Sequence, residues 1–275
     1  MECRLARITV HYESIGAGRP LVVLPGWPDE WRVPADYLEP LFDDRPGWRR
    51  LYLDLPGRGS TTGEPWITTN DQILEIILEV LDHVIGEERF VLAGHSAGAY
   101  LARAILRDRA SRVDGLLQVV PELDTGDKGR PEQVTLVSDD ALIERIEAEL
   151  GPTISEQFAD FFVVQSPVTY ERIKTLLPSL RGADKAFLAR LEATLPFEVD
   201  PPAAPFGRPA LFVLGRQDSV VGYRGVLDVM EAYPRATVAI LDRAGHGLPW
   251  EQEPVFRALV SEWLDRVEDE TRALT

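Results

Sequence analysis

Continuous apolar runs alternate with amphipathic segments along the first part of the chain. Uninterrupted runs at residues 20–24 and 113–120 are typical of parallel strands that are buried on both faces. A long segment from Asn70 has its apolar side chains at helical spacing, which predicts an amphipathic helix that Asn70 caps and Gly86 ends. The same patterns predict short strands at 4–10, 11–14, 51–53 and 90–93, and helices at 34–42 and 99–107.

The pattern changes after Pro121. From residue 122 to 205 the sequence has helical patterns and no convincing strand, with helices expected at 139–150, 168–177 and 184–195 and after a capping box of Thr153 and Glu156. Alternation resumes at residue 210, with strands at 211–214 and 237–241 and helices at 224–233 and 253–267. A connection of roughly 80 residues is too long for a structureless loop. We therefore predict an α/β core, residues 1–121 and 206–275, that is interrupted by a helical insertion, residues 122–205.

Composition narrows the choice of partners. The hydrophobic content of 45% and the charged content of 27% are ordinary for a globular protein. The net charge is −16, from 45 acidic against 29 basic residues. Nucleic acids and anionic lipid surfaces bind basic patches, so this charge opposes both classes of partner. We expect a small-molecule substrate, no nucleic acid and no membrane partner, and the sequence carries no signal for an oligomeric state.

Cysteine usage and the N-terminus indicate the compartment. The single cysteine, Cys3, can form no internal disulfide and no cysteine-based metal site. The first residues lack the basic region and long apolar run of a signal peptide, and no apolar run approaches the ~18 residues of a membrane span. The sequence therefore predicts a cytoplasmic protein.

The main chemical signal is Gly94-His95-Ser96-Ala97-Gly98, which lies between a predicted strand and a predicted helix. In this context a serine is held at a strained corner with its Oγ exposed. The two glycines fit this interpretation, because a turn this tight brings backbone against backbone. The motif alone is equally consistent with a glycine-rich turn, so the serine needs further support.

A serine hydroxyl is a poor nucleophile at neutral pH and needs a base, usually a histidine. Three of the four histidines are expected to pack or to face solvent: His11, His83 and His95. His246 differs, because it lies between two glycines in a loop that follows the predicted strand at 237–241. Open α/β sheets have their sites at such strand ends. His246 is therefore the candidate base.

The base in turn needs a carboxylate that orients it. Asp218 follows the predicted strand at 211–214, which gives the chain order Ser96, Asp218, His246. Glu122 and Asp124 follow the strand at 113–120 and stay as alternatives. Asp54 also lies at a strand end, where it is expected to brace its Pro-Gly-Arg-Gly turn.

The reaction also needs donors for a developing oxyanion. The backbone N–H of Ala97, directly after the serine and at the start of a helix, is one candidate. The N–H of Trp27, in the loop Pro25-Gly26-Trp27-Pro28, is the second. Because the backbone supplies the donor, the Trp27 side chain is free to pack.

At this point the chain resembles the α/β-hydrolase superfamily, in particular its single-domain serine hydrolases with a helical cap. The resemblance covers nearly all of the chain and rests on the segment 54–60, the corner at Ser96, Gly215-x-x-Asp218 and Gly245-His246. It implies a mostly parallel, eight-stranded sheet with helices on both faces and a cap formed by residues 122–205. It also implies that Ser96 is the nucleophile, His246 the base and Asp218 its partner, with Ala97 and Trp27 as the oxyanion hole.

Three positions depart from the family pattern. Pro25 precedes Gly26 where many relatives have a histidine, and Ala99 stands where a further glycine is common. The nucleophile position carries Ser96 rather than an aspartate. This difference disfavours epoxide hydrolase and haloalkane dehalogenase activity, which use a carboxylate there.

We therefore predict a serine hydrolase, independent of metals and cofactors, that cleaves a small to medium, partly apolar carboxylic ester or lactone. The alternatives are C–C bond hydrolysis of a vinylogous diketone with the same triad, peptidase action on an N-terminal residue, and a non-hydrolytic small-molecule binding protein. Four aromatic residues of the insertion are candidate pocket walls, although aromatics at helical spacing more often form a core: Phe158, Phe161, Phe162 and Tyr170.

Overall fold

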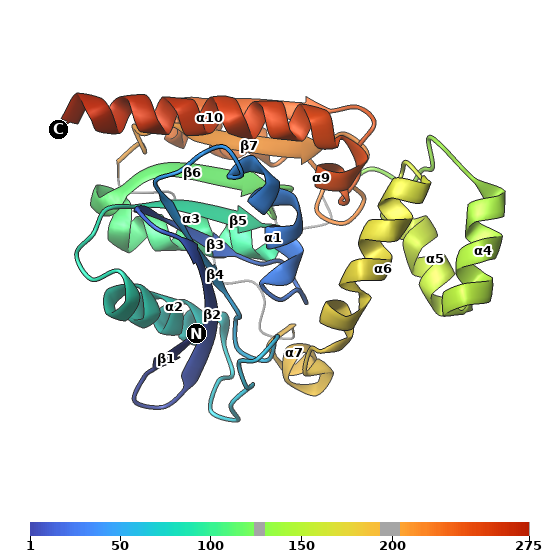
Figure 1. Ribbon diagram of the computed structural model, residues 1–275, viewed down its shortest axis with the longest axis horizontal. Coiled ribbons are helices and arrows are strands. Elements are labelled where there is room, and N and C mark those ends of the chain that lie inside the picture. Colours follow the sequence, from blue (N-terminus) through green and yellow to red (C-terminus); the bar gives the residue numbers. More distant parts are fainter. Residues whose placement is uncertain (124–129, 193–203, 275) are drawn as a thin grey trace.

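The computed structural model describes residues 1–123, 130–192 and 204–274. Its centre is an eight-stranded sheet with the strand order β1-β2-β4-β3-β5-β6-β7-β8 (Figure 1). The strands are β1 (Glu2–Arg4), β2 (Thr9–Gly16), β3 (Arg19–Leu24), β4 (Trp48–Leu53), β5 (Phe90–His95), β6 (Val113–Val119), β7 (Ala210–Gly215) and β8 (Ala236–Leu241). Only β1 with β2 and β2 with β4 pair antiparallel among these strands. The predicted mostly parallel, eight-stranded sheet is confirmed.

The first two strands have other bounds than predicted. The Leu5 N–H donates to the Ile8 carbonyl oxygen at 2.9 Å, which closes a turn directly after β1. Strand β2 then runs unbroken to Gly16. The predicted division into 4–10 and 11–14 is wrong, because hydrophobic alternation does not show where a tight turn reverses the chain.

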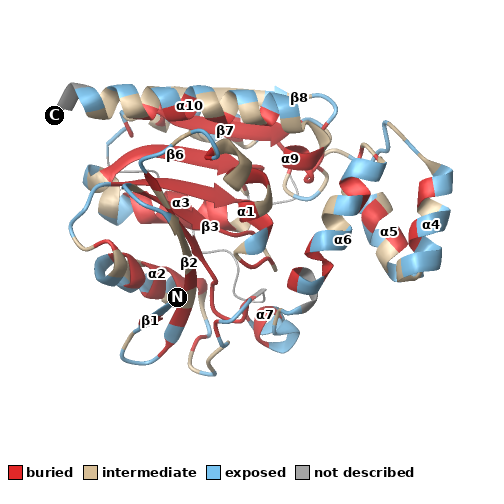
Figure 2. Cartoon of the chain, viewed as in Figure 1, coloured by how far each residue is buried: buried red, intermediate tan, exposed pale blue. Residues whose placement is uncertain are grey.

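Helices cover both faces of the sheet, so its strands are buried throughout the centre (Figure 2). One face packs against α2 (Asn70–Val84) and α3 (Ala97–Arg109), and the other against α1 (Arg32–Leu38) and α10 (Glu253–Leu274). Neighbouring strand residues belong to opposite cores, as Leu21 and Val22 do. This two-sided burial explains the continuous apolar runs of the sequence.

Helix α2 begins at Asn70, but the residue before it provides the cap. Thr69 Oγ1 accepts from the Gln72 N–H, and Gln72 Oε1 accepts from the Thr69 N–H, which is a capping box. The expectation that Asn70 caps the helix is therefore wrong by one residue. Gly86 follows the helix with a φ of 54°, as expected for a residue that ends it.

Four described helices lie between β6 and β7 and form a helical insertion beyond the carboxyl ends of the strands (Figure 1). They are α4 (Asp140–Leu150), α5 (Pro152–Phe161), α6 (Pro167–Arg181) and α7 (Lys185–Glu192). Asp139 caps α4 by accepting from the Leu142 N–H at 3.0 Å. The predicted capping box of Thr153 and Glu156 is wrong, because α5 begins directly after Gly151 and Thr153 is already helical.

The last part of the chain returns to the sheet. The predicted helix at 224–233 consists of a short α8 (Val226–Val229) and a 3₁₀ turn at Met230–Ala232. Helix α9 (Leu248–Glu251) precedes α10, which continues past its last core side chain, Val267. Beyond that position the helix has no apolar periodicity, so the sequence pattern ends too early. Two further 3₁₀ turns lie at Glu39–Leu41 and Ala110–Arg112. None of the described helices is both long and apolar enough to cross a membrane.

Candidate active site

Ser96 lies at a strained corner between β5 and α3. Its φ of 53° and ψ of −119° are values that residues other than glycine rarely adopt. Such strain persists only where the surrounding structure holds it, and here two backbone segments do so. A Cβ at Gly94 would lie 2.4 Å from the Gly98 carbonyl oxygen, and a Cβ at Gly98 would lie 2.3 Å from the Leu24 carbonyl oxygen. Only glycine fits at either position, so the strand and the helix meet directly at the serine.

The structure brings Ser96, His246 and Asp218 together. His246 Nε2 is 3.1 Å from Ser96 Oγ, and His246 Nδ1 is 2.8 Å from Asp218 Oδ2. All three side chains are buried. Asp218 is itself held, because its Oδ1 accepts from the backbone N–H groups of Val220 and Val221 at 2.9 and 3.0 Å. This arrangement, which we call the Ser–His–Asp series, follows from three strand ends that meet at one edge of the sheet.

Of the alternative acids, Glu122 lies near His246 but does not orient it. The hydrogen bond of His246 Nδ1 goes to Asp218. Glu122 acts through its charge, which is one of the influences that raise the pKa of His246. Asp124, the other alternative, lies outside the described residues.

Electrostatics favour a basic imidazole. Burial disfavours the charged form of His246, but the charge of Asp218 and its hydrogen bond outweigh burial. With smaller contributions from Asp29 and Glu122, the pKa of His246 is raised above its ordinary 6.5. The neutral imidazole that exists above this pKa can accept the Ser96 proton and is a stronger base than an unperturbed histidine.

Two backbone segments with candidate oxyanion donors lie beside Ser96. Ala97 is the first residue of α3, where N–H groups have no acceptor within the helix. The loop after β3 packs against the serine, since a Cβ at Gly26 would lie 3.3 Å from Ser96 Cβ. The Asp29 N–H donates to the Gly26 carbonyl oxygen at 3.1 Å, which folds this loop around Trp27.

His95 and Asp29 form a second polar pair next to His246. The His95 ring stacks on the His246 ring with a centroid distance of 5.7 Å and an interplanar angle of 28°. His95 Nδ1 lies 3.4 Å from Asp29 Oδ2, and both side chains are buried. The sequence predicted that His95 packs, which it does, but not that it packs on His246. The signal for Asp29 was an acidic residue in a loop that directly follows a buried strand.

Glu251 connects the loop of His246 to the helical insertion, and sequence reasoning missed it. Its Oε2 accepts from the Gly245 N–H at 2.7 Å, and its Oε1 accepts from the N–H groups of Val163 and Val164 at 2.7 and 3.1 Å. Burial raises the pKa of this carboxyl to about 7, although the three N–H donors favour its charged form. The available signal was a glutamate five residues after His246, on the way into the last helix.

The four candidate pocket aromatics divide into two groups. The Phe161 ring meets the His246 ring edge-on, with a centroid distance of 5.7 Å and an interplanar angle of 90°. Phe158, Phe162 and Tyr170 are almost completely buried, and Phe158 packs against the rings of the other two. Phe158 and Tyr170 belong to the core of the insertion, which is the alternative that their helical spacing indicated. Phe162 also packs on Trp250 of α9, with a centroid distance of 6.4 Å, and lies against Gly247, directly after His246. Of the four aromatic residues, Phe161 is the one whose ring contacts His246.

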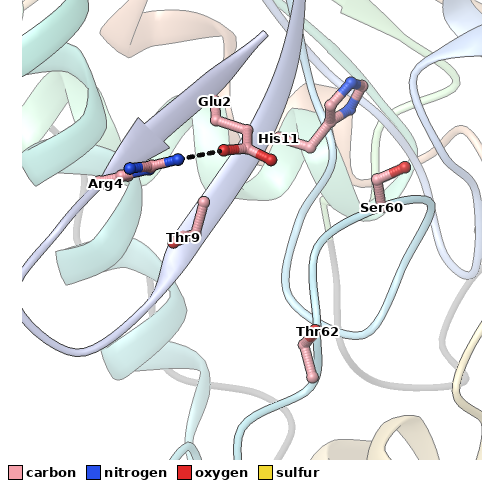
Figure 3. Close-up of a pocket in the computed structure, with 6 residues that line it drawn as sticks. All are labelled: Glu2, Arg4, Thr9, His11, Ser60 and Thr62. Carbon is pink, nitrogen blue, oxygen red and sulfur yellow. Dashed lines mark hydrogen bonds and ion pairs between the residues drawn. The ribbon is translucent and has the colours of Figure 1, made fainter.

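A separate polar pocket of about 400 Å³ lies at the N-terminal hairpin (Figure 3). Its walls include Arg4, His11 and Ser60, and none of the Ser–His–Asp series lines it. Asp54 is fully buried beside it and accepts from the N–H groups of Trp31 and Ser60, each at 3.0 Å. Asp54 thus braces its turn, as the sequence predicted, and has no part in the Ser–His–Asp series.

Comparison with known proteins finds relatives that span most of this chain. A family model of the alpha/beta hydrolase fold matches residues 19–253. The AB hydrolase superfamily protein YisY of Bacillus subtilis is 24% identical over 262 residues, which are 93% of this chain and 95% of that protein. N-formylmaleamate deformylase of Pseudomonas putida is 24% identical over 268 residues, which are 94% of this chain and 93% of that protein.

Solved structures show the same similarity. The crystal structure of an alpha/beta superfamily hydrolase from Oenococcus oeni superposes with a TM-score of 0.85 at 26% identity and covers 98% of this chain and 99% of that chain. An esterase from Thermogutta terrifontis superposes with a TM-score of 0.65 at 22% identity and covers 94% of each chain. Since the family model matches residues 19–253, which are most of the sequence, the chain belongs to the alpha/beta hydrolase family.

Proposed function

We propose that the protein is a serine hydrolase that cleaves a small to medium, partly apolar carboxylic ester or lactone through an acyl-enzyme on Ser96. The observation that carries this proposal is the Ser–His–Asp series, in which a serine at a strained corner is hydrogen-bonded to a histidine of raised pKa. Among the relatives is a pimeloyl-[acyl-carrier protein] methyl ester esterase of Legionella pneumophila, 22% identical over 267 residues. Ester hydrolysis is therefore within the chemistry of similar proteins.

The mechanism follows from the distances. His246 Nε2 takes the hydroxyl proton across 3.1 Å while Ser96 Oγ attacks the carbonyl carbon. Asp218 holds the Nδ1–H tautomer and stabilises the imidazolium. The Ala97 and Trp27 N–H groups stabilise the oxyanion, and His246 then passes the proton to the leaving alcohol. A water molecule, activated by the same histidine, releases the acid and restores Ser96.

In this proposal the chain divides into a hydrolase core, residues 1–121 and 206–275, and a cap, residues 122–205. The cap supplies a substrate wall beside the reacting groups, Phe161, whose ring contacts the His246 ring at right angles. Specificity for a partly apolar substrate follows from that contact, because an aromatic ring offers apolar area next to the reacting group.

Hydrolysis of a carbon–carbon bond in a vinylogous diketone is the second candidate, since it uses the same triad. It is favoured by relatives such as the 2-hydroxy-6-oxononadienedioate/2-hydroxy-6-oxononatrienedioate hydrolase of Paraburkholderia phymatum, 24% identical over 279 residues. A non-hydrolytic binding protein on this fold is the third. It would bind a small molecule without turnover.

A panel of p-nitrophenyl esters, lactones and vinylogous diketones separates these candidates. The proposal expects ester turnover with a burst of p-nitrophenol, labelling of Ser96 by a fluorophosphonate, and loss of both in Ser96→Ala. The exposed Ser60 offers a matched control, and Ser60→Ala should behave as wild type. Full activity in a folded Ser96→Ala protein would overturn the mechanism. Absence of labelling and turnover would favour the binding protein.

A further inference from the structure

Arg58 is a buried arginine in the loop that follows β4. Its side chain is 4% exposed. The loop backbone is held by hydrogen bonds on both sides of it, from the Arg58 N–H to the Leu55 carbonyl oxygen and from the Thr61 N–H to the Arg58 carbonyl oxygen, each at 3.0 Å. The guanidinium carbon lies 4.5 Å from the centre of the Trp27 ring. Arg58 therefore contacts the loop that supplies the second candidate oxyanion donor.

Apart from the Trp27 ring, the charge of Arg58 has no partner among the described residues. Its guanidinium makes no hydrogen bond or ion pair there, and the buried Nε is unpartnered. Burial lowers the pKa of Arg58 to about 10, even though the charges of Asp29 and Asp54 oppose this change. These two carboxylates are thus near enough to influence the guanidinium but do not replace its hydration.

Another buried arginine of the same chain, Arg50, does have a carboxylate acceptor for its guanidinium. Arg50, 9% exposed, binds both carboxylate oxygens of Glu39, at 3.0 and 2.6 Å, and its pKa is raised. Arg58 is more deeply buried and has no such acceptor. Since a buried guanidinium without an acceptor is costly, its donors are available for an anion that binds there.

The position of Arg58 is between the oxyanion loop and the helical insertion. On one side is the Trp27 ring; on the other, α7 covers the loop. A Cβ at Gly57 would lie 2.3 Å from the Phe187 ring, and the Asp184 N–H donates to the Gly57 carbonyl oxygen at 2.9 Å. The junction of core and insertion is where alpha/beta sheets of this type bind their ligands, beyond the carboxyl ends of the strands.

Asp29 connects this position to the reacting groups. A Cβ at Gly26 would lie 2.8 Å from Asp29 Oδ2 and 3.3 Å from Ser96 Cβ, so the carboxylate and the serine flank the same glycine. The charge of Asp29 favours the protonated forms of both groups: it opposes the lowering of the pKa of Arg58 and contributes to the raised pKa of His246. Asp29 is therefore close enough to both Arg58 and His246 to influence their protonation.

We propose that Arg58 binds a carboxylate of the substrate, so that the substrate class is an ester or lactone that carries a free carboxylate away from the bond that is cleaved. This proposal rests on the hydrolase function given above. The planar fork of a guanidinium matches a carboxylate with two parallel hydrogen bonds. A singly charged carboxylate fits better than a doubly charged phosphate, because Asp29 and Asp54 already place negative charge nearby.

Two p-nitrophenyl esters of equal length test the proposal, the glutarate hemiester with a terminal carboxylate and the neutral valerate. Wild type should prefer the hemiester, and Arg58→Gln should lower kcat/KM for it by about tenfold to a hundredfold, mainly through KM. The neutral ester should lose much less, because only the hemiester carries the carboxylate that Arg58 binds. Arg49→Gln, which removes a partly exposed arginine paired with Glu88 at 2.9 Å, is the matched control and should leave both rates unchanged. Equal losses on both esters, or no preference in wild type, would overturn the proposal.

Two further measurements keep this result separate from hydrolysis and from folding. In the Ser96→Ala background, calorimetric binding of monomethyl glutarate should persist and should be lost with Arg58→Gln, whether or not the protein turns over esters. Absence of binding in Ser96→Ala contradicts the carboxylate site, whereas absence of fluorophosphonate labelling contradicts only the hydrolase function. Arg58→Met should melt at or above the wild-type temperature, because it removes a buried charge without a partner. A lower melting temperature would indicate a structural role instead.

Discussion

Replacing Glu251 with glutamine should impair turnover while the fold stays intact. The carboxylate holds three backbone N–H groups, of which one is Gly245, directly before His246, and two are Val163 and Val164 in the insertion. A glutamine has one carbonyl oxygen and one NH₂ group. If the oxygen stays with the two insertion donors, the NH₂ group faces the Gly245 N–H, and two donors then repel each other. The Gly245 N–H, directly before His246, then has no acceptor at this position.

The expected loss of activity can be derived from this one contact. A hydrogen bond to a charged group contributes about 1.5–3 kcal/mol. If the whole contribution is felt in the transition state, the rate falls by about tenfold to somewhat over a hundredfold. The lost bond positions the base rather than the substrate, so kcat should fall and KM should change little.

The stability of wild type relative to Glu251→Gln should depend on pH. Burial raises the pKa of Glu251 from 4.5 to about 7, which favours the protonated form in the folded chain by about 3 kcal/mol. Above pH 4.5 the unfolded chain releases this proton and the folded chain keeps it. The contribution is therefore complete below pH 4.5 and is lost as the pH rises through about 7. Glutamine does not titrate, so wild type should lose stability relative to Glu251→Gln between about pH 5 and pH 8.

Two assays decide the matter, steady-state ester kinetics at about pH 8 and urea unfolding at about pH 5 and pH 8. The control is Glu253→Gln, the same change two positions later, where the carboxylate forms partly exposed ion pairs with Arg257 at 3.2 Å and Arg172 at 3.9 Å and accepts no hydrogen bond from the loop of His246. A folded Glu251→Gln protein with the kcat of Glu253→Gln would refute the coupling between the carboxylate and His246. A stability difference that is equal at both pH values would refute the titration argument.

Three other outcomes follow from the same structure. The kcat/KM of wild type should rise with pH through an ionisation above 6.5, because only neutral His246 accepts the serine proton, and Asp218→Asn should lower that midpoint in a rate profile. Gly98→Ala should cost about 3 kcal/mol or more in urea unfolding, since its Cβ would lie 2.3 Å from the Leu24 carbonyl oxygen and neither backbone can yield. Phe187→Ala, at a position of α7 that is 2% exposed, should cost about 3–5 kcal/mol and make the insertion more sensitive to limited proteolysis.

The sheet and the Ser–His–Asp series were predictable because each leaves a local trace in the sequence. Buried strands appear as apolar runs, and each of the three residues follows such a run in an order that limits the fold. Glycines at 94 and 98 are required by backbone contact, which a motif can record. Local spacing gave a wrong prediction at Thr153. Helix α5 begins at Pro152 after Gly151, and no side chain caps it.

What sequence reasoning missed depends on contacts between distant segments. Glu251 is one of several glutamates near the last helix, and only the folded chain shows that it reaches Val163 across 88 positions. Arg58 belongs to a turn that was expected to need bracing by Asp54, and that expectation says nothing about where its guanidinium lies. The role of such charged residues is set by burial and by the neighbours they have after folding, and neither is a property of local spacing.

The residues of the Ser–His–Asp series are far apart along the chain, so the ribosome synthesises them at different times. Ser96 and His246 are separated by 150 positions. At about 5–20 residues per second, a ribosome delivers the base roughly 8–30 s after the nucleophile. During that interval the corner at β5 exists without a proton acceptor, so in our proposal the growing chain carries no hydrolytic activity. The first turnover would therefore mark the docking of the last strands, and its appearance during refolding would report the completion of the whole sheet.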